Sequence, residues 1–171
     1  QECGDNFWDV FLALGENRIE AIKEKNISRN TVHFIWNIQS QKIAEIVRSC
    51  STIHSLANLK HAQKIERLWI TTQAFLQIQL DSEKDIWIWE SELSAFLEIC
   101  KNMKYLKIIW ISGMGAWEFD EEQKRDEFKK LISLRNTYIP NGLISAGTSR
   151  DYEIAIEQWI DIVRVGSNAI M

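Results

Sequence analysis

The sequence predicts an α/β fold, a TIM-type (β/α)8 barrel that lacks about one βα unit in this chain. Short apolar runs rich in β-branched residues alternate with longer amphipathic segments, which is the pattern of a parallel sheet covered by helices. The chain has 171 residues, fewer than the roughly 200 to 250 that a complete barrel takes. A doubly wound open sheet is the alternative that the same alternation allows.

The predicted strands are short apolar and β-branched runs with turn-forming residues on either side. A further run, at residues 10–14, is a candidate for an additional strand at the start of the chain. The six clear runs lie at residues 31–35, 52–55, 74–80, 106–111, 143–145 and 162–165.

The predicted helices carry apolar residues at spacings of three and four, with charged residues on the opposite face. Ser91 is expected to cap the fourth helix, and Ser149 with Asp151 and Glu153 is expected to open the sixth. No linker divides the chain, so we expect a single domain over residues 1–171. The helices are expected at residues 18–25, 41–50, 59–68, 90–101, 121–137 and 152–158.

Composition and charge argue against several classes of function. Acidic residues outnumber basic residues by 24 to 20 and there is no basic block, so no nucleic-acid partner is expected. The longest apolar runs have about eight residues, far below the roughly 20 that span a bilayer, so no membrane partner is expected either. Three widely spaced cysteines indicate reduced thiols and a cytoplasmic location. The chain starts at Gln1 rather than Met, which we interpret as a fragment of a longer protein.

Small and hydroxyl residues follow the last two predicted strands, at the end of the sheet where parallel α/β folds bind ligands. Residues 144–151 read Ile-Ser-Ala-Gly-Thr-Ser-Arg-Asp, and Gly166-Ser167 follows the final strand. Backbone N–H groups and hydroxyls in such turns can cradle a phosphate. One such turn alone is more often an ordinary cap, but two in the last two βα positions favour a phosphate site.

Arg164 lies inside an apolar strand, where a buried guanidinium needs an acceptor. A structural ion pair would supply one, and so would a ring nitrogen or an anion in the mouth of the barrel. His33, His54 and His61 have no Cys or carboxylate at the spacing of metal ligands, so no metal site is expected. The order of residues indicates no catalytic carboxylate pair or Ser–His–Asp arrangement.

Four segments, taken in order along the chain, form a specific pattern. They are Gly15-Glu16-Asn17, the His-Phe-Ile-Trp-Asn-Ile-Gln-Ser-Gln-Lys of residues 33–42, residues 75–93, and residues 145–167. The last segment contains Ser-Ala-Gly-Thr-Ser-Arg-Asp, then Ala-Ile, then Val-Arg-Val-Gly-Ser. Together they resemble the motifs of the YggS/PROSC-type pyridoxal phosphate homeostasis proteins, nearly from end to end of the chain.

The resemblance implies a TIM barrel of the alanine racemase N-terminal type, without about its first βα unit, that binds one pyridoxal 5′-phosphate (PLP). Such proteins handle and buffer this form of vitamin B6 and have no established reaction of their own. The resemblance also implies a monomer whose partners are PLP and PLP-dependent apoenzymes.

Site residues follow from the resemblance by position. Arg164 would face the pyridine nitrogen, where a fixed positive charge disfavours protonation of the ring and weakens PLP as an electron sink. Asn17 would stand near the rim of the cofactor. The implied phosphate ligands are Ser145, Gly147, Ser149, Gly166 and Ser167.

One departure concerns the lysine that holds the PLP aldehyde as a Schiff base. In the family this lysine lies on the first strand, well before Gly-Glu-Asn, so it is expected upstream of Gln1. We therefore expect the 171-residue chain to bind PLP weakly or not at all. Two alternative functions remain: a PLP-dependent racemase or decarboxylase barrel domain, and a sugar-phosphate enzyme on the same fold.

Eight Trp outnumber seven Gly, an unusual balance for a globular chain. Compared with the family motifs, Trp36, Trp87, Trp110 and Trp159 stand where Gly is found, and the other four lie in turn-like contexts. Trp159 is expected at the C′ position of a helix, which favours left-handed backbone and hence Gly. Our hypothesis is UGA recoding, in which UGA codons read as Gly by the organism have been translated as Trp. The alternative is that Trp was selected for core packing.

Overall fold

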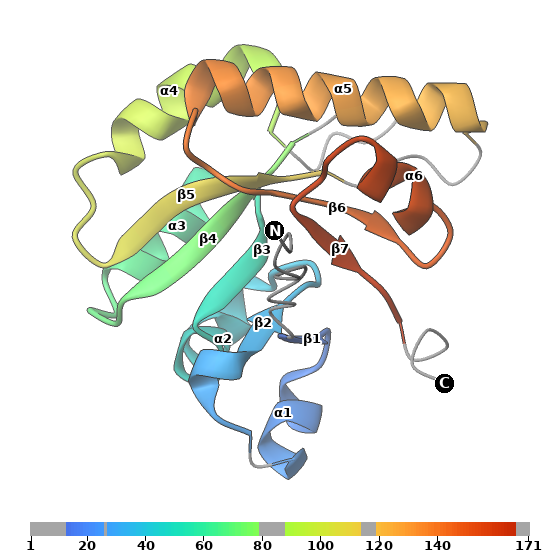
Figure 1. The fold of residues 1–171 in the computed structure, drawn as a ribbon. Helices are drawn as coiled ribbons and strands as arrows, with labels where there is room; N and C mark the ends of the chain where they lie inside the picture. Colours follow the sequence, from blue (N-terminus) through green and yellow to red (C-terminus); the bar gives the residue numbers. More distant parts are fainter. Residues whose placement is uncertain (1–12, 26, 79–87, 114–118, 167–171) are drawn as a thin grey trace, which may run out of the picture.

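The computed structural model describes residues 13–25, 27–78, 88–113 and 119–166, whose strands form one parallel sheet (Figure 1). The strands are β1 (Leu14–Glu16), β2 (Val32–Phe34), β3 (Thr52–Leu56), β4 (Thr72–Gln77), β5 (Leu106–Ser112), β6 (Ile144–Thr148) and β7 (Ile162–Arg164). The helices are α1 (Ile19–Lys25), α2 (Ile43–Ser49), α3 (Leu59–Glu66), α4 (Glu90–Cys100), α5 (Glu121–Tyr138) and α6 (Tyr152–Glu157), with short 3₁₀ helices η1 (Arg29–Thr31) and η2 (Ser40–Lys42).

Strands that are neighbours in the sequence are also neighbours in the sheet. The order is β1-β2-β3-β4-β5-β6-β7, and every neighbouring pair is parallel. A doubly wound sheet reverses its strand order at a switch point, so the sequential order excludes that alternative. Figure 1 shows the helices on the outer side of a curved sheet.

The sheet curls enough for side chains on distant strands to touch. His54 on β3 and Ser145 on β6 are three strands apart, yet His54 Nδ1 lies 3.0 Å from Ser145 Oγ. In a flat sheet, three strand spacings would separate them by about 14 Å. The strands therefore bend around a common interior, which these two polar side chains enter.

The strands and helices that the sequence predicts are present, with shifted ends. The candidate additional strand is β1, which begins at Leu14, and residues 10–12 lie outside the described residues. The strand predicted at residues 74–80 already begins at Thr72, whose N–H donates to the carbonyl of Tyr105 over 2.9 Å. It ends at Gln77, and residues 79 and 80 lie outside the described residues.

Apolar side chains fill the layer between the sheet and the helices. Ile46 of α2, Leu93 of α4, Leu131 of α5 and Ala155 of α6 are fully buried in one continuous cluster. Removing this surface from water is the main force that holds the helices on the sheet. In the described part of the chain, no helix combines the length and apolar character that a bilayer crossing requires.

A single carboxylate ties α3 to the start of β5. Glu66, the last residue of α3, accepts hydrogen bonds from the backbone N–H groups of Lys104, Tyr105 and Leu106 at 2.8, 2.9 and 2.8 Å. Burial alone would raise the pKa of Glu66, but these three N–H groups, with Lys107, outweigh it and lower the pKa. The ionised carboxylate is therefore part of the fold at the amino-terminal side of the sheet.

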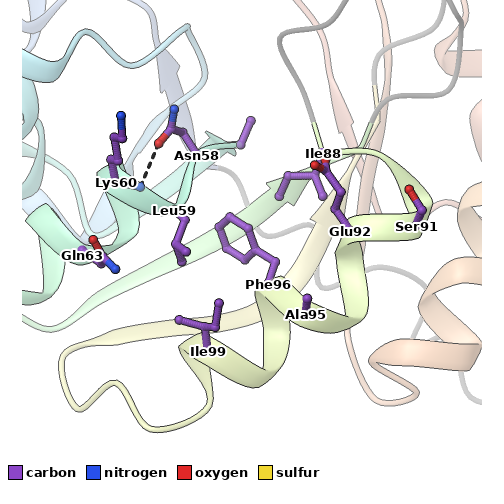
Figure 2. Close-up of a pocket in the computed structure, with 11 residues that line it drawn as sticks. Asn58, Leu59, Lys60, Gln63, Ile88, Ser91, Glu92, Ala95, Phe96 and Ile99 are labelled. Atoms are coloured by element: carbon purple, nitrogen blue, oxygen red, sulfur yellow. Dashed lines mark hydrogen bonds between the residues drawn. The ribbon is translucent and has the colours of Figure 1, made fainter.

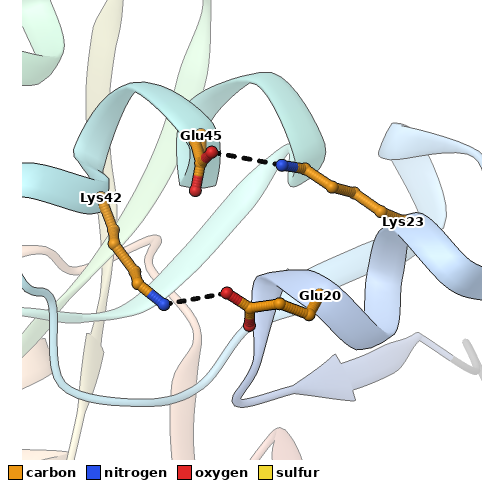
Figure 3. Close-up of polar contacts among 4 residues, drawn as sticks. All are labelled: Glu20, Lys23, Lys42 and Glu45. Atoms are coloured by element: carbon orange, nitrogen blue, oxygen red, sulfur yellow. Dashed lines mark hydrogen bonds and ion pairs between the residues drawn. The ribbon is translucent and has the colours of Figure 1, made fainter.

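Two exposed ion pairs join α1 to the segment that carries η2 and α2 (Figure 3). Lys23 Nζ lies 3.2 Å from Glu45 Oε1, and Lys42 Nζ lies 3.0 Å from Glu20 Oε1. Pairs this exposed contribute at most about 1 kcal/mol each and are weakened by salt. They orient α1, but the buried apolar residues supply its stability.

The predicted cap of α4 is wrong. The helix begins at Glu90, so Ser91 lies inside its first turn rather than before it. The N–H of Trp89, which precedes the helix, donates to the Glu92 carboxylate over 3.3 Å. The helix start is fixed from its third residue, whose carboxylate reaches back to the chain before it.

Two Trp residues adopt left-handed backbone, which L side chains rarely do. Trp69, after α3, has a φ of 57°, and Trp159, after α6, has a φ of 60°. After α6, the N–H groups of Trp159 and Ile160 donate to the carbonyls of Ile156 and Ala155, each over 3.0 Å. This is a Schellman motif with Trp159 at its C′ position, as the sequence predicted.

Core packing accounts for few of the described Trp residues. The indoles of Trp159, Trp69 and Trp36 are 86%, 73% and 57% exposed, whereas Trp110 packs its ring 4.6 Å from that of Phe75. Trp89 is 36% exposed, and the remaining predicted positions, Trp8, Trp87 and Trp117, lie outside the described residues.

Candidate functional site

The turn between β6 and α6 requires Gly at one position. Gly147 has a φ of 82°, and a Cβ added there would lie 2.6 Å from the Cβ of Ala155 on α6. Both the left-handed backbone and the close approach of the helix exclude a side chain. This turn is the first of the two that the sequence assigned to a phosphate.

A hydrogen bond joins this turn to the end of β7. Ser149 Oγ accepts from the N–H of Gly166 over 2.9 Å, and both residues are exposed. The two turns that follow the last two strands are therefore in direct contact at the carboxyl edge of the sheet.

Asp151 closes the first turn from within. Its Oδ1 accepts from the N–H and the hydroxyl of Thr148 at 2.6 and 2.9 Å. The predicted opening of α6 by Ser149 and Asp151 is therefore wrong in detail: Asp151 holds the N-cap position but its side chain makes no capping bond. Both side chains bind strand-end residues instead, which fixes the shape of the turn.

Arg164 reaches from β7 to the start of β6 and to the carboxyl end of β5. Its Nη1 donates to the carbonyl and the hydroxyl of Ser145 at 2.8 and 2.7 Å, and its Nη2 donates to the carbonyl of Gly113 at 2.9 Å. Burial lowers the pKa of Arg164 to about 10, and Asp151 opposes the shift. The guanidinium therefore stays charged at neutral pH beside the two turns.

Two histidines continue this hydrogen-bonded group into the interior. His54 Nδ1 lies 3.0 Å from Ser145 Oγ, and His54 Nε2 lies 2.9 Å from Nδ1 of His33 on β2. Burial lowers the pKa of His33, and burial, assisted by the positive charge of Arg164, lowers the pKa of His54 well below 6.5. Both rings are therefore neutral at pH 7.

The structure separates the predicted site residues into groups. Ser149 and Gly166 contact each other in the two turns, and Gly147 is buried near the end of β6, whereas Ser145 is fully buried and its hydroxyl binds Arg164 and His54. Asn17 is exposed directly after β1, at the opposite edge of the hydrogen-bonded sheet from β7. Ser167 lies outside the described residues.

The place of His33 and His54 in this group was not predicted from the sequence, where they were weighed only as metal ligands. Each lies inside a buried strand, where a polar ring needs a partner for the same reason as Arg164. That signal could have found them. His61 is remote, with Nε2 2.8 Å from Ser40 Oγ, and the described residues contain no cluster suited to a metal ion.

A groove of about 740 Å³ lies elsewhere, between α3 and α4 (Figure 2). Leu59, Phe96 and Ile99 line it, with Lys60 and Glu92 among its polar residues. Its lining includes neither turn and not Arg164, so it is separate from the candidate site.

Comparison with curated proteins gives close agreement on one family, although no protein-family model matches the chain. A pyridoxal phosphate homeostasis protein of Synechocystis is 33% identical over 146 residues, covering 79% of this chain and 66% of that protein. One from Helicobacter pylori is 29% identical over 166 residues, covering 91% of this chain and 75% of that protein. The chain belongs to the pyridoxal phosphate homeostasis protein family.

Solved structures place this pyridoxal phosphate homeostasis family member on the expected fold. PipY of Synechococcus elongatus, a COG0325 family member, has a TM-score of 0.82 at 19% identity and covers 92% of this chain and 80% of its own. Alanine racemase from Corynebacterium glutamicum has a TM-score of 0.69 at 12% identity, covering 91% of this chain and 46% of its own. The fold is the alanine racemase-like TIM barrel, as predicted.

Proposed function

We propose that this chain holds PLP weakly and non-covalently at the carboxyl ends of β6 and β7 and serves in PLP homeostasis. The observation that carries the proposal is the contact between the two turns, through Ser149 Oγ and the Gly166 N–H, beside the charged Arg164. The family names support it, and PipY was also solved with PLP bound, at a TM-score of 0.80.

The two turns fit a phosphate group. Gly147 lets α6 pack directly on the end of β6, which fixes the backbone that leads into the first turn. Ser149 Oγ and the N–H of Gly166 are exposed groups that can turn from each other to phosphate oxygens. Ser167, which follows them in the sequence, completes the proposed set.

The guanidinium fits the ring side of the cofactor. Bound PLP supplies an aldehyde that condenses with amines and a pyridine ring that withdraws electrons. Arg164, held by the carbonyls of Ser145 and Gly113, would present a fixed positive charge to the ring nitrogen and keep it unprotonated. Such a ring is a weak electron sink, which suits a protein that holds the cofactor.

The remaining features follow from family membership. We propose that residues 1–171 form a single PLP-binding domain in a cytoplasmic monomer that passes PLP to apoenzymes. Asn17 would lie at the rim of the cofactor. We also propose that the protein catalyses no reaction of its own, although its fold relatives include a racemase and an arginine decarboxylase.

The binding site is tested with pyridoxine 5′-phosphate, which lacks the aldehyde and so needs no lysine. Isothermal titration should show binding that Ser149→Ala weakens by about tenfold, the loss of one hydrogen bond to a charged group. Ser94→Ala, an exposed serine on α4, is the matched control and should change nothing. Equal affinities for both variants and the wild type would overturn the assignment of the turns.

Catalysis is tested separately, on protein purified from the natural host. Racemisation and decarboxylation of amino acids should stay at the rate of free PLP. Turnover above that rate, lost on Arg164→Leu, would replace the homeostasis proposal by the enzyme alternative.

A further inference from the structure

We propose that His33 and His54 are positioning residues that hold Arg164, through Ser145, at the tilt that a pyridine ring requires. The inference rests on the proposed function, since it concerns the ring side of the same site. It assigns a role to the buried pair that the family comparison leaves unexplained.

Hydrogen bonds connect the four residues in series across the barrel interior. His33 Nδ1 lies 2.9 Å from His54 Nε2, and His54 Nδ1 lies 3.0 Å from Ser145 Oγ. Ser145 Oγ in turn lies 2.7 Å from Arg164 Nη1. This series of hydrogen bonds runs from β2 through β3 and β6 to β7.

The direction of these bonds follows from Arg164, because a guanidinium can only donate. Ser145 Oγ accepts from Arg164, which leaves its own proton for His54 Nδ1. His54 then carries its proton on Nε2 and donates to His33 Nδ1, so His33 carries its proton on Nε2 as well. Every bond has one proton, and both rings are neutral.

If the hydrogen bonds between the histidines and Ser145 ran in the opposite direction, the Ser145 hydroxyl would lack an acceptor for its proton. With a proton on His54 Nδ1, both His54 and Arg164 would donate to Ser145, and the serine O–H would need another acceptor. Among the described hydrogen bonds, Ser145 Oγ has only these two partners. Ser145 is fully buried, so water does not readily replace the missing acceptor.

Packing fixes the histidine end of the chain. The His54 ring stacks on Phe75 with centroids 4.0 Å apart, and Phe75 packs on Trp110 at 4.6 Å. The backbone carbonyl of His54 also accepts from the Ser112 hydroxyl. The ring is held before any ligand arrives, as a preorganised site requires.

Loss of the histidines should affect binding of the ligand ring and not of its phosphate. Arg164 keeps its bonds to the carbonyls of Ser145 and Gly113 without the histidines, so it stays in the mouth. What it loses is the fixed orientation of the Ser145 hydroxyl, which His54 holds and to which Nη1 donates. Among the described hydrogen bonds, none joins His54 to Ser149 or Gly166, so the phosphate turns should be unaffected.

The experiment compares two phosphate esters: pyridoxine 5′-phosphate, which has a ring nitrogen, and benzyl phosphate, which has none. His54→Leu should weaken pyridoxine 5′-phosphate about tenfold and leave benzyl phosphate within about twofold. His54→Asn keeps an amide near the Nδ1 position and should restore most of the affinity. His61→Leu, on α3, is the matched histidine control and should change neither ligand.

Equal weakening of both ligands by His54→Leu would mean a merely structural role and would overturn the inference. Because this variant can fail to fold, ¹⁵N NMR of the wild-type rings gives a second test. Nε2–H tautomers of His33 and His54 are expected, and a proton on His54 Nδ1 would refute the chain of bonds. Wild-type protein that binds neither ester would instead refute the proposed function.

Discussion

Trp159 offers a direct measurement of how badly the side chain fits its backbone. It holds the C′ position of α6 with a φ of 60°, and its indole is 86% exposed. We predict that Trp159→Gly is more stable than Trp159→Ala. Both variants lose the indole, so their difference isolates the effect of a Cβ on left-handed backbone.

The magnitude follows from two opposing terms. A residue with a Cβ pays roughly 1 to 2 kcal/mol for left-handed backbone. Glycine loses about 0.5 to 1 kcal/mol more chain entropy on folding. The Gly variant should therefore exceed the Ala variant by about 0.5 to 1 kcal/mol in the free energy of unfolding, and Trp69, with a φ of 57°, should behave alike.

Urea unfolding followed by circular dichroism resolves such a difference as a shift in midpoint at constant slope. Trp36 is the matched control, since its indole is 57% exposed but its φ is not positive. There the Gly variant should be the less stable by about 0.5 to 1 kcal/mol. Gly variants no more stable than Ala variants at Trp159 and Trp69 would refute the reasoning.

The same positions bear on the UGA-recoding hypothesis. If it is right, the coding DNA has UGA at these Trp positions, and mass spectrometry of protein from the natural host shows Gly there. UGG codons at Trp36, Trp87, Trp110 and Trp159 would refute the hypothesis.

Three further predictions concern stability, the turn and the thiols. Glu66→Gln should lower the free energy of unfolding by about 2 kcal/mol, since an amide cannot accept three N–H bonds. In the wild type the pKa of Glu66 is lowered from 4.5 on folding, so the ionised carboxylate stabilises the fold fully above about pH 4.5. This stabilisation is lost as the pH falls through the lower pKa of the folded state. An unchanged acid limb in urea titrations of this variant would contradict that. Gly147→Ala should abolish pyridoxine 5′-phosphate binding and lower the melting temperature, as calorimetry and titration will show, because its Cβ would lie 2.6 Å from that of Ala155. Burial raises the pKa of Cys50 to about 12 and of Cys100 to about 11, so iodoacetamide at pH 8 should label both only after unfolding; native labelling would argue against their burial.

The order of strands and helices could be predicted because each carries its own local pattern. Alternation of short apolar runs with amphipathic segments is enough for a parallel sheet, and the contact between the turns at Ser149 and Gly166 follows once β6 and β7 are neighbours. Strand and helix ends were less accurate. Ser91 and Ser149 are residue types that often cap helices. At α4, however, the Glu92 carboxylate binds the N–H before the helix, and at α6 the Ser149 hydroxyl is bound by the Gly166 N–H.

The interior of the site could not be predicted, because it depends on how far the sheet curls. Nothing local says that His54 meets Ser145, since residues three strands apart come together only in a closed curve. The resemblance to the family implies Ser145 as a phosphate ligand. The structure instead buries its hydroxyl between Arg164 and His54, on the ring side of the proposed site.

The contact between His54 and Ser145 also bears on the order of folding. Each strand pairs with its neighbour in the sequence, so the sheet can grow one βα unit at a time at little cost in loop entropy. The two side chains are 91 residues apart, and their hydrogen bond forms only when the growing sheet has curled. We expect the slowest folding step to be this closure, with the histidine resonances changing last.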